Sequence, residues 1–243
     1  MINDQLVPFK AVLFVFLLLA LASVISHQSG LDRLIAHLIY SIEGGTDHGF
    51  PWSKNYWLYT VLHEGGRGLV KRLWFFNLLL LVCSFFINSL SSFRRVFLYI
   101  ALATLISTSL ISSLKHLTTI PCPKALQEFG GDRKWIDIWQ VFAANIRRGS
   151  CYPAGHASGG YAWICLAFLF PFKSRNFYMA LLPGALMGLV FGIAQQLRGA
   201  HFLSHDLLTI AVCWLTSGLL LTLMQMPWRA STQDSAAYSS PTS

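Results

Sequence analysis

Apolar stretches about as long as a bilayer is thick constrain this sequence more than any other feature. A helix needs about 20 mostly apolar residues to cross roughly 30 Å of hydrocarbon. Only 12% of the 243 residues are charged, whereas 54% are hydrophobic, and this composition excludes an ordinary soluble domain. The sequence therefore predicts an all-α, polytopic membrane protein with six transmembrane helices in one bundle. The six stretches lie at about 9–27, 73–90, 95–114, 156–172, 177–195 and 206–226.

The same pattern predicts one domain, at residues 1–229, followed by a tail at residues 230–243. The tail is rich in Ser, Thr and Ala, a composition typical of disorder. The first apolar stretch is interpreted as an uncleaved anchor, because its n-region carries only Lys10 and residues 23–27 form a poor cleavage site. A cleaved signal peptide is the alternative.

Two segments between the apolar stretches differ from them in composition. Residues 31–42 look amphipathic, which favours a helix at the membrane interface rather than another crossing. Residues 116–152 mix Pro, Gly, charged residues and Trp. That mixture is typical of an ordered lid, or of short helices, over a site.

Short basic loops orient the predicted bundle. Arg94 and Arg95 lie between the second and third stretches, and Lys173 and Arg175 lie between the fourth and fifth. By the positive-inside rule these loops face the cytoplasm. The opposite face carries more cations in total, but long segments translocate largely regardless of charge. The expected location is the inner membrane of a Gram-negative-like bacterium, with cytoplasmic termini and the site facing the periplasm.

The five cysteines fall into two groups. Cys83, Cys165 and Cys213 lie inside apolar stretches and are interpreted as small core residues. Cys122 and Cys151 both lie in the long loop before the fourth stretch. A disulfide between them would fit an oxidising compartment, and two unrelated thiols are the alternative, since connectivity does not follow from sequence.

Three short motifs fall at the same membrane face once the apolar stretches are counted. They are Lys115 to Pro123, Pro153 to His156, and Arg198 to Asp206. In the second motif, Pro suits the first turn of a helix, Gly lets a ligand approach the backbone, and free amides at a helix start can hold an anion. The convergence of the motifs on one face predicts a phosphate site.

The third motif places three polar side chains on one face if it is helical. Arg198, His201 and His205 are then at positions i, i+3 and i+7. Taken singly, an arginine here is typical of an interfacial cation and a histidine of a buried, satisfied residue. His201 and His205 also have metal-ligand spacing, but no acidic residue lies between them and no third ligand is evident.

These motifs resemble the type 2 phosphatidic acid phosphatase superfamily, membrane lipid phosphate phosphatases that share an active-site plan with vanadium haloperoxidases. The family pattern is Lys-x6-Arg-Pro, then Pro-Ser-Gly-His, then Ser-Arg-x5-His-x3-Asp. The corresponding segments of this chain are Lys115-x6-Cys122-Pro123, Pro153-Ala154-Gly155-His156 and Arg198-x2-His201-x3-His205. The resemblance covers the half of the chain from the third stretch to the sixth.

The resemblance implies a role for each motif residue. His201 would attack phosphorus to form a phosphohistidine, and His156 would protonate the leaving alkoxide. Lys115 and Arg198 would neutralise the phosphoryl oxygens, and His205 stands where the family has the Asp that orients the nucleophile. The chemistry is reasonable, because a neutral imidazole is a competent nucleophile and a protonated one a competent acid near neutral pH. No metal or other cofactor is implied.

The sequence departs from the family pattern at several positions. The departures are Cys122 and Gln195 in place of Arg, Ala154 in place of Ser, and His205 in place of Asp. Other groups are expected to bind the substrate instead, because phosphoryl charge favours guanidinium donors and backbone amides. They are Ala154 and Gly155 through their backbone and Arg67, with Arg147 and Arg148 as alternatives to Arg67. Asp206, one residue from His205, is included in the substrate-binding set as the replacement for the missing Asp.

The expected function is hydrolysis of a lipid phosphate or diphosphate. Phosphatidic acid, phosphatidylglycerophosphate, undecaprenyl diphosphate and lipid A have suitable head groups. A phosphotransferase that moves phosphate from a polyprenyl diphosphate to another lipid, and a protein that binds lipid head groups without turnover, are the alternatives. The net charge of +8 fits membrane lipids and an anionic substrate rather than requiring nucleic acid. The sequence does not indicate an oligomeric state.

Overall fold

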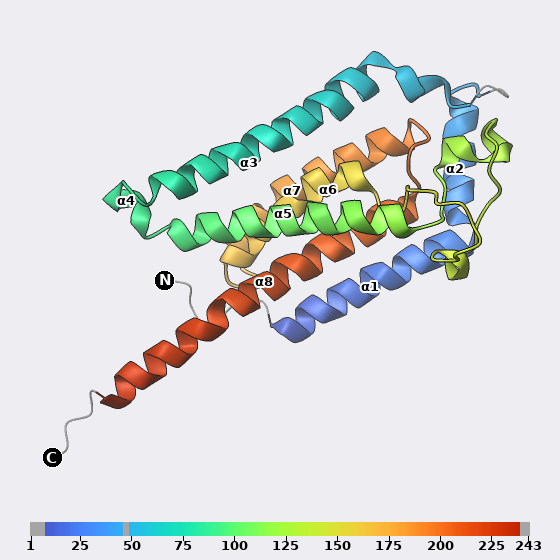
Figure 1. Cartoon of the computed structure of the whole chain (residues 1–243). Coiled ribbons are helices and arrows are strands. Elements are labelled where there is room, and N and C mark those ends of the chain that lie inside the picture. Colours follow the sequence, from blue (N-terminus) through green and yellow to red (C-terminus); the bar gives the residue numbers. More distant parts are fainter. Residues whose placement is uncertain (1–7, 46–48, 239–243) are drawn as a thin grey trace.

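The computed structural model describes the backbone of residues 8–45 and 49–238, and side chains as far as residue 224. Within these residues 75% are helical and no strand is present, which confirms the predicted all-α class. Long helices lie side by side and make a bundle (Figure 1). They are α1 (Phe9–Gln28), α3 (Gly66–Cys83), α5 (Arg94–Leu117), α7 (Arg175–Gln196) and α8 (Leu203–Tyr238), with α6 (Gly155–Tyr161) continuing into the 3₁₀ helix η6 (Ala162–Leu169).

Within the described part of the chain, four helices are long and apolar enough to cross a membrane, so the predicted count of six is not confirmed. They are Phe9–Gln28, Arg94–Leu117, Arg175–Gln196 and Leu203–Met224. The second predicted stretch differs because α3 begins earlier, at Gly66, and carries three cations in its first two turns, Arg67, Lys71 and Arg72. The fourth differs because its helix changes from α to 3₁₀ geometry at Ala162 and both pieces are short.

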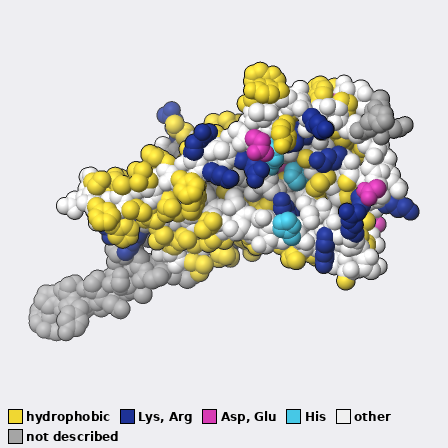
Figure 2. All heavy atoms as spheres, turned by 45° about the horizontal axis from the view of Figure 1, so that its top comes forward, with side chains coloured by type: hydrophobic (Ala, Val, Ile, Leu, Met, Phe, Trp, Pro, Cys, Tyr) yellow, Lys and Arg dark blue, Asp and Glu magenta, His cyan; other side chains and the backbone are white. Residues whose placement is uncertain are grey.

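The membrane assignment fits the outer surface of the bundle. Large apolar side chains are exposed along the long helices, such as Phe14 on α1, Phe75 on α3 and Leu182 on α7, each at least 55% exposed. Contact with lipid tails would remove this apolar area from water. Figure 2 shows hydrophobic side chains gathered over one half of the face in view, with Lys, Arg and His side chains over the other half.

Helix α2 (Leu31–Ile42) crosses one end of the bundle, at a large angle to the long helices (Figure 1). This matches the amphipathic helix predicted at residues 31–42. The loop between α5 and α6 covers the same end. It contains three short helices, η3 (Pro123–Ala125), η4 (Gln127–Phe129) and η5 (Ile138–Gln140). The helical segments η1 (Pro51–Lys54) and η2 (Trp57–Gly65, a π-helix) lead from α2 into α3.

The opposite end of the bundle carries the short basic loops. Helix α4 (Asn88–Ser91) joins α3 to α5 there, and α1 begins there (Figure 1). Helix α8 extends beyond the bundle at that end and includes residues 230–238, for which the sequence predicted disorder. Residues 239–243 lie outside the described residues. The division into a domain and a tail therefore stays a prediction.

Close packing between α6 and α7 places the start of α6 inside the bundle. A Cβ atom added to Gly160 would lie 2.3 Å from the backbone nitrogen of Gly188. A Cβ atom added to Gly188 would lie 2.2 Å from the ring of Tyr161. Small residues allow helix backbones to approach closely in membranes. Glycine at both positions therefore holds α6 against α7 and positions His156, which follows Gly155.

Candidate active site

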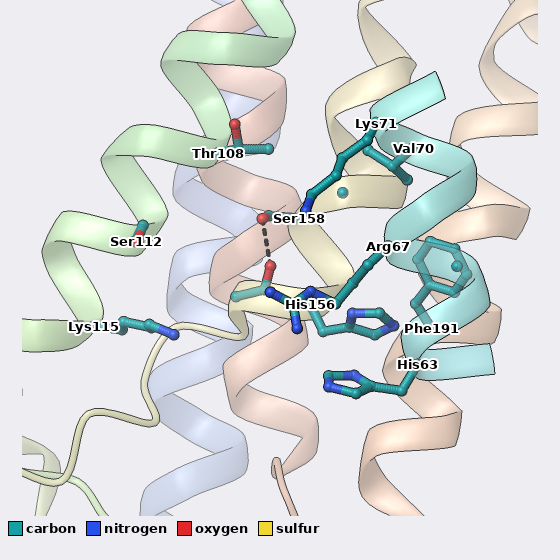
Figure 3. Close-up of a pocket in the computed structure, with 13 residues that line it drawn as sticks. His63, Arg67, Val70, Lys71, Thr108, Ser112, Lys115, His156, Ser158 and Phe191 are labelled. Atoms are coloured by element: carbon teal, nitrogen blue, oxygen red, sulfur yellow. Dashed lines mark hydrogen bonds between the residues drawn. The ribbon is translucent and has the colours of Figure 1, made fainter. Parts of the chain in front are cut away.

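A cavity of about 520 Å³ opens at the α2 end of the bundle. Its wall comes from α3, the second half of α5, the start of α6 and the second half of α7. Its charged and titratable lining residues are His63, Arg67, Lys71, Lys115 and His156, and no Asp or Glu is among the described residues that line it. Figure 3 shows these side chains directed into a common space. A cavity with three cations and no carboxylate is suited to an anionic ligand.

Lys115 lies in the last two turns of α5 and reaches the start of α6. A Cβ atom at Gly155 would lie 3.3 Å from Lys115 Nζ, so the absence of a side chain at Gly155 leaves room for the ammonium group. The sequence predicted both residues as part of the site, and the structure brings them together with His156 (Figure 3).

Ala154 lies outside this cavity, although its backbone was expected to bind the substrate. The residue is fully buried. Its N–H donates to the carbonyl oxygen of His205 at 3.2 Å, and its own carbonyl accepts from Thr209 Oγ1 at 3.2 Å. Both backbone groups are thus used to attach the chain before α6 to α8, and neither is free for a phosphate.

His63 lies against His156 in the cavity. Their ring centroids are 4.4 Å apart, and His156 Nε2 lies 3.3 Å from the carbonyl oxygen of Leu62. The ring of Phe191 covers another side of His156, at 4.8 Å between centroids. Burial, followed by the positive charge of Arg198, lowers the pKa of His63 below its ordinary value. His63 is therefore a neutral imidazole at neutral pH.

Arg198 supports the wall of the cavity rather than lining it. It is 9% exposed, its Nε donates to the carbonyl oxygen of Ser53 at 3.0 Å, and its guanidinium lies 4.9 Å from the ring centroid of Tyr59. Its Nη1 donates to Gln195 Oε1 at 3.0 Å. Segments η1 and η2 thus hold the guanidinium of Arg198, and its contact with phosphoryl oxygens stays a prediction.

The bond from Arg198 decides the state of His63. Because Gln195 Oε1 accepts from Arg198, its Nε2 is the donor to His63 Nδ1, at 2.9 Å. His63 Nδ1 then accepts, and the proton of the neutral ring is on Nε2. Arg198, which was expected near the phosphate, and Gln195, which stands in place of a family Arg, are thus linked to the cavity through His63.

His201 and His205 form a pair next to the cavity. His201 lies in the link before α8, is partly buried, and does not line the cavity of Figure 3. Its Nδ1 is 3.3 Å from Nδ1 of the fully buried His205. Burial, followed by the charges of His205, Lys115 and His156, lowers the pKa of His201 well below its ordinary value. His201 is therefore neutral at neutral pH.

The other predicted binding residues divide between the cavity and the surface. Arg67 lines the cavity, and its Nη1 lies 3.4 Å from Glu64 Oε1. Arg147 and Arg148, the alternatives to Arg67, lie elsewhere, because Arg147 pairs with Asp132 at 3.7 Å and Arg148 donates to the carbonyl oxygen of Leu117. Asp206 also lies outside the cavity, where it accepts from Gln196 Nε2 at 2.7 Å.

The chain segments that carry the three motifs are joined near the cavity. Cys122 and Cys151 are placed as a disulfide pair, with their Cα atoms 5.4 Å apart. The N–H of Lys124 donates to the carbonyl oxygen of Gly199 at 2.9 Å. The cysteine pair connects the segment after α5 to the segment before α6. The hydrogen bond connects the loop after α5 to the link before α8.

Sequence reasoning missed two cavity residues as members of the site, His63 and Lys71. Lys71 follows Arg67 by four positions, the spacing that puts two side chains on one face of a helix, and this signal was available. His63 carried no such signal, because it joins the site through Gln195, 132 positions away. Among the described residues, no group of three or more His, Cys, Asp or Glu side chains is placed to hold a metal ion.

A family model described as the PAP2 superfamily matches residues 94–229, more than half of the chain. The chain belongs to the PAP2 superfamily. Members of the PAP2 superfamily are generally phosphatases, which supports phosphoester hydrolysis as the general chemistry here. No curated protein and no solved structure shows significant similarity to the chain.

The PAP2 match covers only part of the cavity. It includes α5 to α8, and with them Lys115, His156 and His201. His63, Arg67 and Lys71 lie before residue 94, so the segments that precede the PAP2 match supply the opposite wall.

Proposed function

We propose that this protein is an integral membrane phosphatase that hydrolyses a lipid phosphate or diphosphate through a phosphohistidine on His201. The observation that carries the proposal is the cavity that joins Lys115, Arg67 and Lys71 to His156 in a PAP2 superfamily chain. His201 does not line this cavity but interacts electrostatically with Lys115 and His156. A site that only binds phosphate needs cations and backbone amides, and it does not need histidines. Histidines next to those cations favour chemistry over binding without turnover.

In the first step, His201 Nε2 attacks phosphorus and the bond from phosphorus to the ester oxygen breaks. Nε2 is the available nitrogen, because Nδ1 faces His205 at 3.3 Å. Burial lowers the pKa of His156 to about 4, and the negative charge of a substrate phosphate beside it would raise this pKa. His156 then donates a proton to the leaving oxygen, so the lipid departs as an alcohol, or as a monophosphate when the substrate is a diphosphate. In the second step, His156 accepts a proton from water as the water oxygen attacks phosphorus, and inorganic phosphate leaves His201.

The cations of the cavity would stabilise the charge that develops on the phosphoryl oxygens. Lys115 lies closest to the start of α6, and Arg67 and Lys71 reach the same space from α3. Such preorganised donors are worth more in a partly enclosed cavity than in water. His63 lies on this wall beside His156, with its Nε2 3.4 Å from Glu64 Oε1.

The arrangement of the helices supports a lipid substrate and a periplasmic site. The cavity lies at the end of the bundle occupied by α2, whereas the loop with Arg94 and Arg95 lies at the other end (Figure 1). Basic short loops favour the cytoplasm, so the cavity would open on the periplasmic side of a bacterial inner membrane. Apolar side chains exposed on α3 and α7 would lie against the acyl chains of the surrounding lipids.

The proposal is tested by phosphate release from purified protein in detergent. The substrates are phosphatidic acid, phosphatidylglycerophosphate, undecaprenyl diphosphate and lipid A, each with a metal chelator present. His201→Ala is expected to abolish release, and His116→Ala, a change at an exposed histidine of α5, is the matched control. Release that needs a metal would contradict the mechanism. No release from any lipid, followed by transfer to an added lipid acceptor, would favour a phosphotransferase.

A further inference from the structure

A buried carboxylate lies beside the histidine pair, on a helix that the PAP2 match does not include. Asp32 on α2 is 1% exposed. Its Oδ1 accepts from Ser26 Oγ at 2.7 Å and from the N–H of Ser204 at 3.0 Å, and its Oδ2 accepts from Ser204 Oγ. His27 Nδ1 lies 3.3 Å from Oδ2. A carboxylate buried to this degree is retained as an anion only when such donors replace water.

The donors of Asp32 place it at the first turn of α8, next to His205. Ser204 gives the carboxylate both its backbone and its side-chain hydrogen bond, and His205 is the next residue. Burial raises the pKa of Asp32, but the contact with His27, the interaction with His205 and the hydrogen bonds from Ser204 and Ser26 together bring this pKa below its ordinary value. Asp32 is thus a buried carboxylate hydrogen-bonded to Ser204, the residue before His205.

His205 has a hydrogen-bonding group that nothing in the described structure satisfies. Its Nδ1 faces His201 Nδ1 at 3.3 Å, with the backbone of Cys151 beside both rings, while its Nε2 is buried without a hydrogen-bond partner. The rings of Tyr152 and Phe202 pack against it at 5.2 and 5.3 Å between centroids. A buried polar group without a partner is costly, and a nearby negative charge partly compensates a buried N–H.

We propose that Asp32 is a positioning residue that acts on the nucleophile His201 through His205. His201 Nδ1–H donates to His205 Nδ1, which fixes the His201 tautomer with its Nε2 lone pair free, and His205 keeps its own proton on Nε2. When the bond from Nε2 to phosphorus forms, positive charge develops on the His201 ring. His205 takes a larger share of the Nδ1 proton, and Asp32 stabilises the charge that this places on His205. Hydrolysis of the phosphohistidine returns the proton to His201.

This inference rests on the proposed phosphatase function, but its physical content is the electrostatic link from Asp32 to His201. A structural role for Asp32, as the anchor of α2 on α8, predicts that its loss harms the fold whatever residue is at position 205. A positioning role predicts that the loss matters only while a histidine at 205 lies between Asp32 and His201. The two roles are separated by changing both residues.

The experiment is a double-mutant cycle with Asp32→Asn and His205→Asp. His205→Asp puts a carboxylate directly beside His201 Nδ1. With this carboxylate in place, Asp32 is no longer needed to stabilise the charge on His201. Asp32→Asn alone is expected to lower kcat for phosphate release by about 10- to 100-fold, with KM unchanged because Asp32 does not line the cavity. In the His205→Asp background, Asp32→Asn should not lower kcat. It should raise kcat, because it removes the repulsion between two buried carboxylates. An equal loss in both backgrounds would overturn the proposal.

Two further measurements keep the test valid if Asp32→Asn does not fold or if no lipid is turned over. His205→Asp should retain at least tenfold more activity than His205→Ala, and equal activity of the two would contradict the link to His201. Diethyl pyrocarbonate, which modifies neutral imidazoles, reports on His201 without any substrate. The rate of modification of His201 is measured by peptide mass spectrometry, relative to that of His63 in the same sample. This relative rate should fall severalfold in Asp32→Asn. An unchanged rate would reject the positioning role even if the protein proves not to be a phosphatase.

Discussion

Gln195 on α7 donates from Nε2 to Nδ1 of His63 on η2 at 2.9 Å, between residues 132 positions apart. Gln195 stands where the family pattern has an arginine. The glutamine therefore contributes to the cavity through His63. Its hydrogen bond connects α7 to η2, a segment that precedes the PAP2 match. The resulting donor is His63 Nε2–H, a neutral group that lies 3.4 Å from Glu64 Oε1.

His63→Ala is expected to lower kcat/KM for phosphate release by about 10- to 100-fold, because the cavity loses a fixed donor beside His156. Gln195→Leu should also lower kcat/KM, but by a smaller factor, because the His63 ring remains while its tautomer is no longer fixed. Steady-state kinetics on one lipid substrate measure both. His116→Ala is the control. Wild-type kinetics in His63→Ala would show that this ring only fills space.

Lys115→Ala is expected to lower kcat by about 10²- to 10³-fold, the range found for removal of one donor to a developing oxyanion. Lys71→Ala should act mainly on KM, because Lys71 lies on α3, across the cavity from Lys115 (Figure 3). Arg72→Ala removes a neighbouring cation that does not line the cavity and serves as the matched control. Equal effects of Lys115→Ala and Arg72→Ala would mean that only net charge matters.

Gly188→Ala is expected to destabilise the fold by about 1–3 kcal/mol, because its methyl group would overlap the ring of Tyr161. Gly68→Ala is the control, since the nearest atom to its Cβ position is the end of the Arg72 side chain at 3.7 Å. Replacing glycine with alanine in an open helical position is neutral or slightly stabilising. Thermal unfolding in detergent compares the two, and equal midpoints would argue against the close contact of α6 and α7.

Reduction of the protein is expected to lower its stability by about 2–4 kcal/mol if Cys122 and Cys151 are bonded, because the bridge closes a loop with a sequence separation of 29. Activity should fall as well, since the bridge connects the loop after Lys115 to the segment before His156. Cys122→Ser with Cys151→Ser should reproduce both effects without reductant. Cys83→Ser is the control. If stability and activity survive reduction, two unrelated thiols are the better interpretation.

The chemistry of the bilayer explains why the sequence alone was sufficient for the fold class. A chain inside hydrocarbon must satisfy its backbone hydrogen bonds within each segment, which leaves helices for long apolar stretches. Segments such as Phe9–Gln28 and Arg175–Gln196 are therefore visible from local composition. Motif spacing identified the superfamily for the same reason, because Lys115, His156 and His201 lie close to helix ends that local sequence determines.

Tertiary packing decided which residues share the site. Arg198 donates to the backbone of η1 rather than lining the cavity, and Ala154 is hydrogen-bonded to α8. His63 and Lys71, from segments before the PAP2 match, line the cavity. Asp32 accepts a hydrogen bond from the N–H of Ser204, which is 172 positions away in the sequence and directly precedes His205. These relationships depend on how helices pack on one another. Periodicity within a segment shows which face is apolar, but it contains no information on the distant segment that the face will meet.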